Sequence, residues 1–133
     1  MRSLNRAMLI GHIAADPELR QTKDGLSVAN FPLATNHFVK GDNGEKREFA
    51  DFHRIIAWGK LGEICEEYLK KGMAVYVDGR IVNRSFDDKE GKKHYRTEII
   101  AETLNILTWK RGKSGKGEIE ISEVSEEKET AKA

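Results

Sequence analysis

Residues 75–86 alternate between apolar and polar side chains with a period of two, and this pattern constrains the fold more than any other feature of the chain. Successive side chains of a β-strand point to opposite faces of a sheet, so the segment predicts a strand with two different faces. One face, expected to line a core, carries Val75, Val77, Gly79 and Ile81. The other, expected to meet solvent or a ligand, carries Tyr76, Asp78, Arg80, Val82, Arg84 and Phe86.

Five strands and one helix are predicted, in the order three strands, a helix and two strands. The strands are expected at residues 7–13, 26–38, 46–58, 74–86 and 94–109. The helix is predicted after Gly59, where apolar residues take a helical spacing, and Gly72 is expected to end it. Because most connections have the length of hairpins, a closed antiparallel barrel is favoured over a parallel α/β sheet. This content predicts an all-β OB-fold, a five-stranded antiparallel Greek-key barrel with one helix between strands 3 and 4.

The composition changes after Arg111 and divides the chain into two parts. Residues 1–111 hold every predicted strand and are expected to form one domain, the OB-fold, with a single core. Residues 112–133 are rich in Gly, Lys, Ser and Glu, and 118–133 contain no aromatic residue. Such a segment buries too little apolar area to offset its conformational entropy, so a disordered acidic C-terminal tail is predicted.

Aromatic rings and guanidinium groups share the polar side of the strand at 75–86, as shown by Phe86, Arg84 and Arg80. A surface that offers both cations and flat rings suits single-stranded nucleic acid, whose phosphates attract cations and whose exposed bases stack on rings. The formal net charge of the chain is only +1, so any basic surface must be local.

Two further rings, Phe52 and Trp58, lie on one face of the strand at 46–58, with Arg54 between them. The pattern does not decide which face of that strand is buried, although an unpaired buried guanidinium would be costly. Phe38 is a further candidate for base stacking at the start of a polar hairpin, where packing at the barrel rim is the alternative role. Arg6, Lys60 and Lys71 are candidate phosphate contacts, and a solvated surface charge is the alternative for each.

Enzymatic chemistry has little support in the sequence. The four histidines His12, His37, His53 and His94 lack the spacing of metal ligands, and Cys65 has no second cysteine. No catalytic residue, metal or cofactor is therefore expected. No segment approaches the roughly 20 apolar residues of a membrane span, the start lacks the apolar core of a signal peptide, and a single cysteine fits a reducing compartment. A cytoplasmic protein without membrane contact is expected.

Several motifs resemble those of the bacterial and mitochondrial single-stranded DNA-binding proteins. They are FHRIIAWGKL at 52–61, EYLKKG at 67–72 and VYVDG at 75–79, with further similarity at 4–6, 16–20, 29–35 and 95–98, so that about 1–110 is covered. The resemblance implies an OB-fold that assembles as a homotetramer and protects single-stranded DNA at the nucleoid during replication, recombination and repair. It places base-stacking aromatics at Phe52, Trp58 and Phe86, and phosphate-binding cations at Arg6, Arg54, Lys60, Lys71 and Arg84.

The chain also departs from that family. Phenylalanine stands at 52 and 86, where the family has tryptophan, and the remaining family aromatic aligns at Phe38 or Val39. Residues 118–129 are acidic but have no terminal Pro-Phe, so recruitment of partner enzymes through such a tip is not expected. An OB-fold that binds RNA or tRNA, or one whose barrel face docks a protein, remains the alternative.

Overall fold

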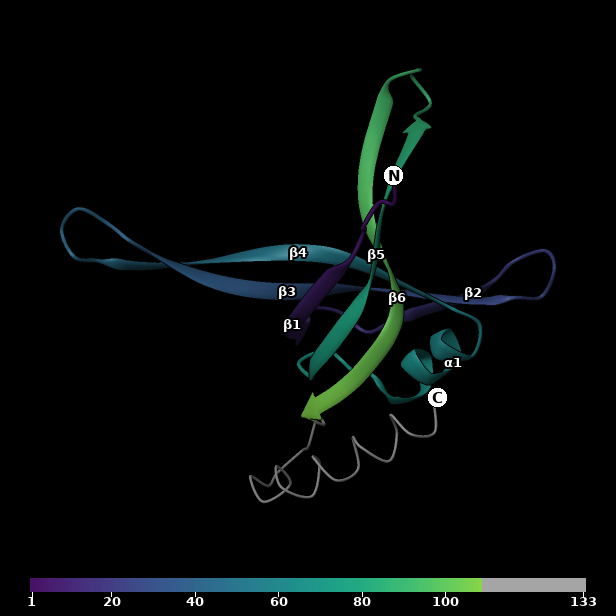
Figure 1. The fold of residues 1–133 in the computed structure, drawn as a ribbon, viewed down its shortest axis with the longest axis horizontal. Coiled ribbons are helices and arrows are strands. Elements are labelled where there is room, and N and C mark those ends of the chain that lie inside the picture. The colour runs from purple at the N-terminus through teal and green to yellow at the C-terminus, as the bar shows by residue number, and fades with distance from the viewer. Residues whose placement is uncertain (109–133) are drawn as a thin grey trace.

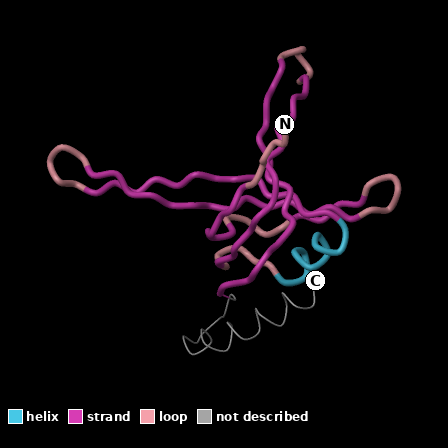
Figure 2. The backbone as a smooth tube through the Cα atoms, viewed as in Figure 1, coloured by secondary structure: helices cyan, strands magenta, loops and turns pink. Residues whose placement is uncertain are grey.

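The computed structural model describes residues 1–108, and the predicted acidic tail at 112–133 lies outside the described residues. Six strands and one helix make up this part of the chain (Figures 1 and 2). In chain order they are β1 (Ala7–Ile13), β2 (Glu18–Gln21), β3 (Ser27–Lys40), β4 (Lys46–Trp58), α1 (Gly59–Tyr68), β5 (Ala74–Asp87) and β6 (Lys93–Thr108).

Five of the strands close into a barrel. The sheet runs β1-β5-β6-β4-β3, and β1 returns to β3 through the pairs His12 with Ala34 and Ile13 with Leu33. All of these pairings are antiparallel except that of β4 with β6, which is parallel over three residue pairs. The predicted five-stranded OB-type barrel, with its helix between the third and fourth barrel strands, is confirmed.

The short strand β2 was not predicted from the sequence. It pairs with the start of β3 from Glu18 opposite Asn30 to Gln21 opposite Ser27, and extends the sheet beyond the barrel. A turn joins the two strands, with the amide of Thr22 donating to the carbonyl of Leu26 at 2.9 Å. All four residues of β2 are exposed, so the segment lacks the alternation that would have indicated a strand.

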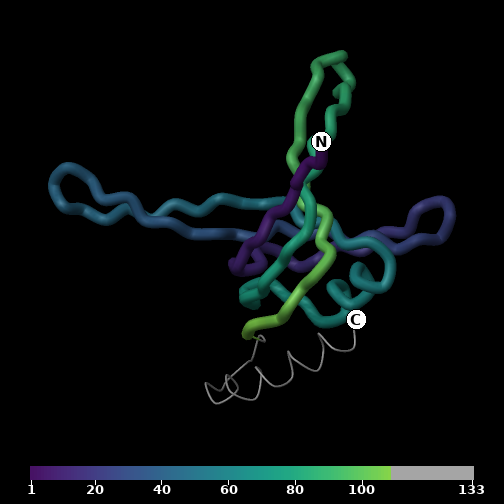
Figure 3. Tube along the Cα trace, in the orientation of Figure 1, coloured from purple at the N-terminus to yellow at the C-terminus, as the bar shows by residue number. Residues whose placement is uncertain are grey.

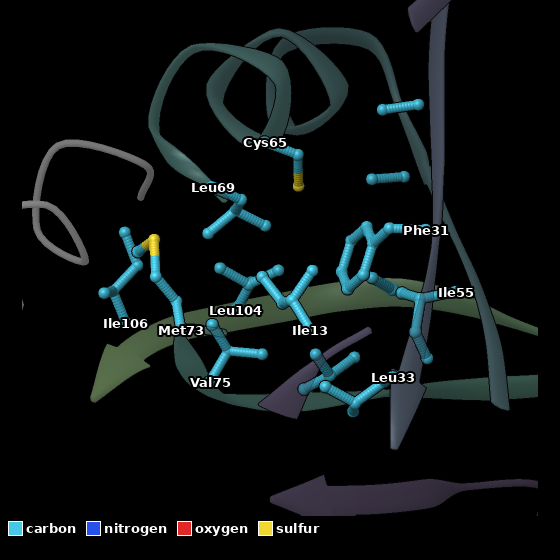
Figure 4. Packing of buried hydrophobic residues seen from close by; sticks show 14 of the residues in the cluster. Ile13, Phe31, Leu33, Ile55, Cys65, Leu69, Met73, Val75, Leu104 and Ile106 are labelled. Atoms are coloured by element: carbon cyan, nitrogen blue, oxygen red, sulfur yellow. The ribbon is translucent and has the colours of Figure 1, made fainter. Parts of the chain in front are cut away.

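The core lies inside the barrel and is closed at one end by α1, which contributes the fully buried Cys65 (Figure 4). Val75 and Val77 are fully buried, as their alternation predicted. Ile81 was predicted to join them and is instead 39% exposed, because the pairing of β5 with β1 ends at Gly79. On β4 the buried face carries Ile55 and Ala57, which settles the question that periodicity left open.

The helix ends earlier than predicted. It stops at Tyr68, and Gly72 lies four residues later in the turn that leads to β5, with a φ of +96°. There the amide of Gly72 donates to the carbonyl of Ile13 at 2.8 Å, which ties this turn to the end of β1. Gly72 therefore shapes the turn after the helix and is not the residue that ends it.

Three hairpins extend from the barrel in different directions (Figures 1 and 3). The longest arm is formed by β3 and β4 and ends at the turn between Lys40 and Lys46, where every residue is exposed. The second arm is formed by β5 and β6 and ends between Asp87 and Lys93. Beyond the barrel neither arm covers a core, so both of its faces meet solvent.

At Gly79, β5 approaches β6 so closely that a side chain would not fit. A Cβ atom at this position would meet the carbonyl oxygen of Ile100, at a β-bulge where the register of the two strands shifts. We expect Gly79→Ala to lower the free energy of unfolding by about 1–3 kcal/mol, because the strands must separate to admit the methyl group. Gly41→Ala is the control, since the nearest atom to its Cβ lies 3.7 Å away. Equal urea midpoints for the two variants would contradict the prediction.

Candidate nucleic-acid interface

Four neighbouring strands share a sheet face that points away from the barrel core, which we call the outer sheet face. It consists of the outward residues of β3, β4, β5 and β6 near the bases of the two long arms. One row across these strands is set by the register and contains Val82, Glu98, Arg54 and Pro32. The next row contains Arg80, Ile100, Ile56 and Asn30. The predicted cations Arg54 and Arg80 therefore lie on the same surface.

The two predicted stacking rings of β4 lie on this face and are exposed to solvent. Phe52 is 67% exposed and Trp58 is 43% exposed. Beside Phe52 is an open depression of about 330 Å³, whose wall includes Asn30, Pro32 and Arg54. The Arg54 guanidinium donates to the side-chain oxygen of Asn30 at 3.1 Å, which holds the cation at the edge of the depression.

The neighbouring histidine of Phe52 points to the other side of β4. His53 lies opposite the fully buried Leu33, and its Nε2 is 2.8 Å from the hydroxyl of Thr35. The His53 side chain is therefore half-buried and hydrogen-bonded.

Phe86 lies on the β5–β6 arm and is 43% exposed. It does not stand alone, because the ring of His94 stacks on it with 5.4 Å between centroids and 19° between planes. The guanidinium carbon of Arg96 lies 5.0 Å from the centroid of the Phe86 ring. A second depression, of about 250 Å³, is lined by Phe86 and Arg96 together with Arg84 and Glu98. The sequence identified Phe86 and Arg84 as candidate binding residues, but it did not identify His94 and Arg96, which lie beside Phe86.

Phe38 lies far out on the β3–β4 arm and is 63% exposed. The strand register puts it on the same face of the arm as Phe52, with the Lys46 ammonium 5.7 Å from its ring centroid. The adjacent Val39 lies on the reverse face together with Phe49, which stacks on His37. Of the two residues aligned with the family aromatic, only Phe38 shares the face of Phe52.

Two of the predicted phosphate-binding cations are paired with buried carboxylates. Arg6 contacts Asp78 at 2.9 Å, and Arg84 contacts Glu98 at 3.2 Å. The carboxylate side chains are only 8% and 3% exposed, whereas the guanidinium side chains are 51% and 64% exposed. The carboxylates therefore fix each guanidinium in place and leave much of it open to an anion.

The remaining cations are distributed unevenly over the surface. Arg80 is exposed on the outer sheet face, and Lys60 lies in the first turn of α1, two residues after Trp58. Lys71 is exposed in the turn before β5, where its amide donates to Asp16 at 2.8 Å. Roughly 40 Å of strand separates the start of β5 from Phe86, so the structure does not bring Lys71 to that ring.

Among residues 1–108 there is no cluster of three or more His, Cys, Asp or Glu side chains that would hold a metal ion. No helix in the same part of the chain is long and apolar enough to cross a membrane.

Known proteins resemble this chain in both sequence and fold. A profile of the single-strand binding protein family matches residues 4–107. Single-stranded DNA-binding protein 1 of Chlorobaculum tepidum is 47% identical over 123 residues, which make up 92% of this chain and 76% of that protein. Single-stranded DNA-binding protein 1 of Xylella fastidiosa is 43% identical over 108 residues, or 80% of this chain and 79% of that protein.

A solved structure described as a Plasmodium falciparum SSB complex with ssDNA has a similar fold. It superposes with a TM-score of 0.74 and 34% identity, and the match covers 80% of this chain and 97% of that chain. The similarity therefore extends through nearly all of the described strands.

The buried carboxylate Asp78 controls the titration of its neighbour Tyr76. The Tyr76 hydroxyl donates to Asp78 at 2.8 Å, and this hydrogen bond to a carboxylate is the main reason why the pKa of Tyr76 is raised. The stability that the bond provides is complete below the ordinary pKa of tyrosine and is lost as pH rises through the raised value.

We expect Asp78→Asn to lower the pKa of Tyr76 and to destabilise the fold by about 1 kcal/mol, since Arg6 also loses its partner. Ultraviolet titration of tyrosine, with Tyr76→Phe to identify the Tyr76 component, measures the first effect, and urea unfolding measures the second. A Tyr76 that ionises at the same pH in both proteins would contradict this account.

Proposed function

This chain belongs to the single-strand binding protein family, and from that premise we propose that it binds single-stranded DNA on the outer sheet face with little preference for base sequence. The observation that carries the proposal is the exposure of Phe52, Trp58 and Phe86, with the fixed guanidinium of Arg54 near Phe52 and that of Arg84 near Phe86. A soluble domain gains nothing in stability from rings left half open to water, whereas a base that covers them removes apolar area from solvent.

The proposed mechanism divides the work between rings and cations. Bases stack on Phe52, Trp58 and Phe86, with Phe38 extending the track along the arm, while Arg54, Arg80 and Arg84 contact phosphates and release counterions. Arg6, Lys60 and Lys71 are proposed as further phosphate contacts where the strand leaves the outer sheet face. Ring faces accept any base, which is why little sequence preference is expected. The mechanism requires no cofactor and no bond-breaking step.

We further propose that the protein works as a homotetramer. Met8 and Ile10 on the outward side of β1 are each 64% exposed, an unusual position for large aliphatic side chains. One edge of β1 pairs with β5 along its length, but the other edge meets β3 only at His12 and Ile13. An open strand edge beside exposed aliphatic groups favours association with further copies of the chain.

In the cell, we propose that this binding protects exposed single strands in the cytoplasm, at the nucleoid, during replication, recombination and repair. Such a role requires binding to any base sequence, and base stacking provides this because every base has a flat face.

Replacing a ring on the outer sheet face tests the binding mechanism. We expect Phe52→Ala to weaken binding of oligo(dT) by roughly 5- to 150-fold, because one stacked base is worth about 1–3 kcal/mol. Phe49→Ala is the matched control, because this ring is 45% exposed on the reverse face of the same arm. Fluorescence anisotropy at several salt concentrations gives both affinities.

Equal losses for the two variants would contradict the proposed track. Tighter binding of an RNA oligomer of matched sequence would favour an RNA-binding role, and unchanged affinity on combining Phe52→Ala with Phe86→Ala would favour a protein-docking face.

The tetramer is tested by charging the outward side of β1. We expect the protein to sediment as a tetramer, and Met8→Glu combined with Ile10→Glu to dissociate it, because buried carboxylates would oppose the contact. Leu26→Glu is the control, since that side chain is 48% exposed in the turn between β2 and β3. A wild-type monomer at micromolar concentration, or a double variant that stays tetrameric, would contradict the proposal.

A further inference from the structure

The turn at the end of the β5–β6 arm is organised around the carboxylate of Asp88. Its Oδ1 accepts hydrogen bonds from the amides of Glu90 at 2.9 Å and Lys92 at 2.8 Å. Two backbone bonds close the same turn, from Gly91 to Asp88 at 3.0 Å and from Asp88 to Lys92 at 2.9 Å. Asp88 is therefore held by the turn, and its second oxygen has a defined direction.

That second oxygen holds His94. The Nε2 atom of His94 lies 2.7 Å from Oδ2 of Asp88. The hydrogen bond from His94 is the largest reason why the pKa of Asp88 is lowered, so the carboxylate is ionised at neutral pH and acts only as an acceptor. Nε2 therefore carries the proton. Nδ1 has no hydrogen-bond partner within residues 1–108.

The fixed imidazole lies against the ring of Phe86. The two rings are nearly parallel, and both remain open to solvent, with 47% of the His94 side chain and 43% of Phe86 exposed. A ring that only supported Phe86 would not need a carboxylate to orient it or an exposed surface of its own. The arrangement instead offers two adjacent aromatic surfaces at one place on the arm.

We propose that His94 is a second base-stacking residue beside Phe86, and that its protonation adds a phosphate contact through Nδ1. This inference rests on the proposed binding of single-stranded DNA. In the neutral form His94 contributes a ring, whereas the protonated form has a second N–H at Nδ1, directed away from Asp88 and able to donate to a phosphate oxygen.

The charged groups near His94 determine the sign of its pH dependence. Asp88 faces Nε2, and Arg96 lies two residues along β6. Asp87 ends β5, Lys92 lies in the turn, and Lys93 begins β6. Protonation adds a positive charge beside the bound strand, so affinity is expected to rise as the pH is lowered. The Asp88 carboxylate, whose pKa is lowered mainly by its hydrogen bond with His94, stays ionised and offsets part of the gain.

Two substitutions separate the ring from the charge. His94→Phe keeps an aromatic surface but does not titrate, whereas His94→Gln removes the ring. Affinity for oligo(dT) is measured from about pH 5.5 to 8.5 at constant ionic strength, with thermal unfolding as a check on the fold. His37→Gln is the matched control, because His37 also stacks on a phenylalanine and lies 3.5 Å from a carboxylate, but on the reverse face of the other arm.

We expect wild-type protein and His37→Gln to bind roughly two- to fivefold more tightly at the acidic end of the range. His94→Phe should bind as tightly as wild type at pH 8.5 but should lose the increase at acidic pH. His94→Gln should bind at least about fivefold more weakly than wild type at pH 8.5. An unchanged pH profile for His94→Phe, or wild-type affinity for His94→Gln at pH 8.5, would overturn the inference. Wild-type protein that fails to bind oligo(dT) at any pH would instead overturn the proposed function.

Discussion

The parallel pairing between β4 and β6 is the contact on which the rest of the structure depends. Only three residue pairs form it, from Arg54 with Glu98 to Ile56 with Ile100, yet they join β1, β5 and β6 to the β4–β3 part of the barrel. The same contact buries Ile55 and Ile99 on the inside and brings Arg54 and Glu98 together on the outside. Beyond it the strands separate, and each continues into its own arm (Figure 1). The core, the outer sheet face and the arms therefore all depend on this short pairing between two strands that are distant in sequence.

Sequence periodicity predicted the barrel well because its strands are half buried, and it failed where that condition ends. Val75 and Val77 follow the alternation, but Ile81 continues the same pattern beyond the last residue of β5 that pairs with β1 and is partly exposed. Strand β2 carries no pattern, since none of its residues is buried. The rings at 52, 58 and 86 were identified from their spacing, whereas His94 and Arg96 acquire their position from cross-strand register. The length of the turn between β5 and β6 sets the register of the hairpin, so a prediction of that turn would also have placed His94 opposite Phe86.

A formal net charge of +1 is small for a protein that binds a polyanion. The placement of individual arginine side chains compensates for this small net charge. Arg6 and Arg84 are tethered to Asp78 and Glu98, which lie almost entirely beneath the surface. A tethered guanidinium loses less side-chain entropy when a phosphate arrives than a free one does. The carboxylates also reduce the long-range field, so the proposed binding depends more on stacking and contact geometry than on attraction from a distance.

The two long arms have a consequence for how this protein can change over evolutionary time. Each is a two-stranded ribbon with water on both sides, and neither contributes side chains to the buried cluster. Local opening of such a ribbon requires far less free energy than melting the barrel. Substitutions in the arms therefore change the stability of the barrel only slightly, whereas they directly change the contacts that the arms make with a ligand. The binding properties of such a protein can therefore change through the arms while the barrel fold is kept.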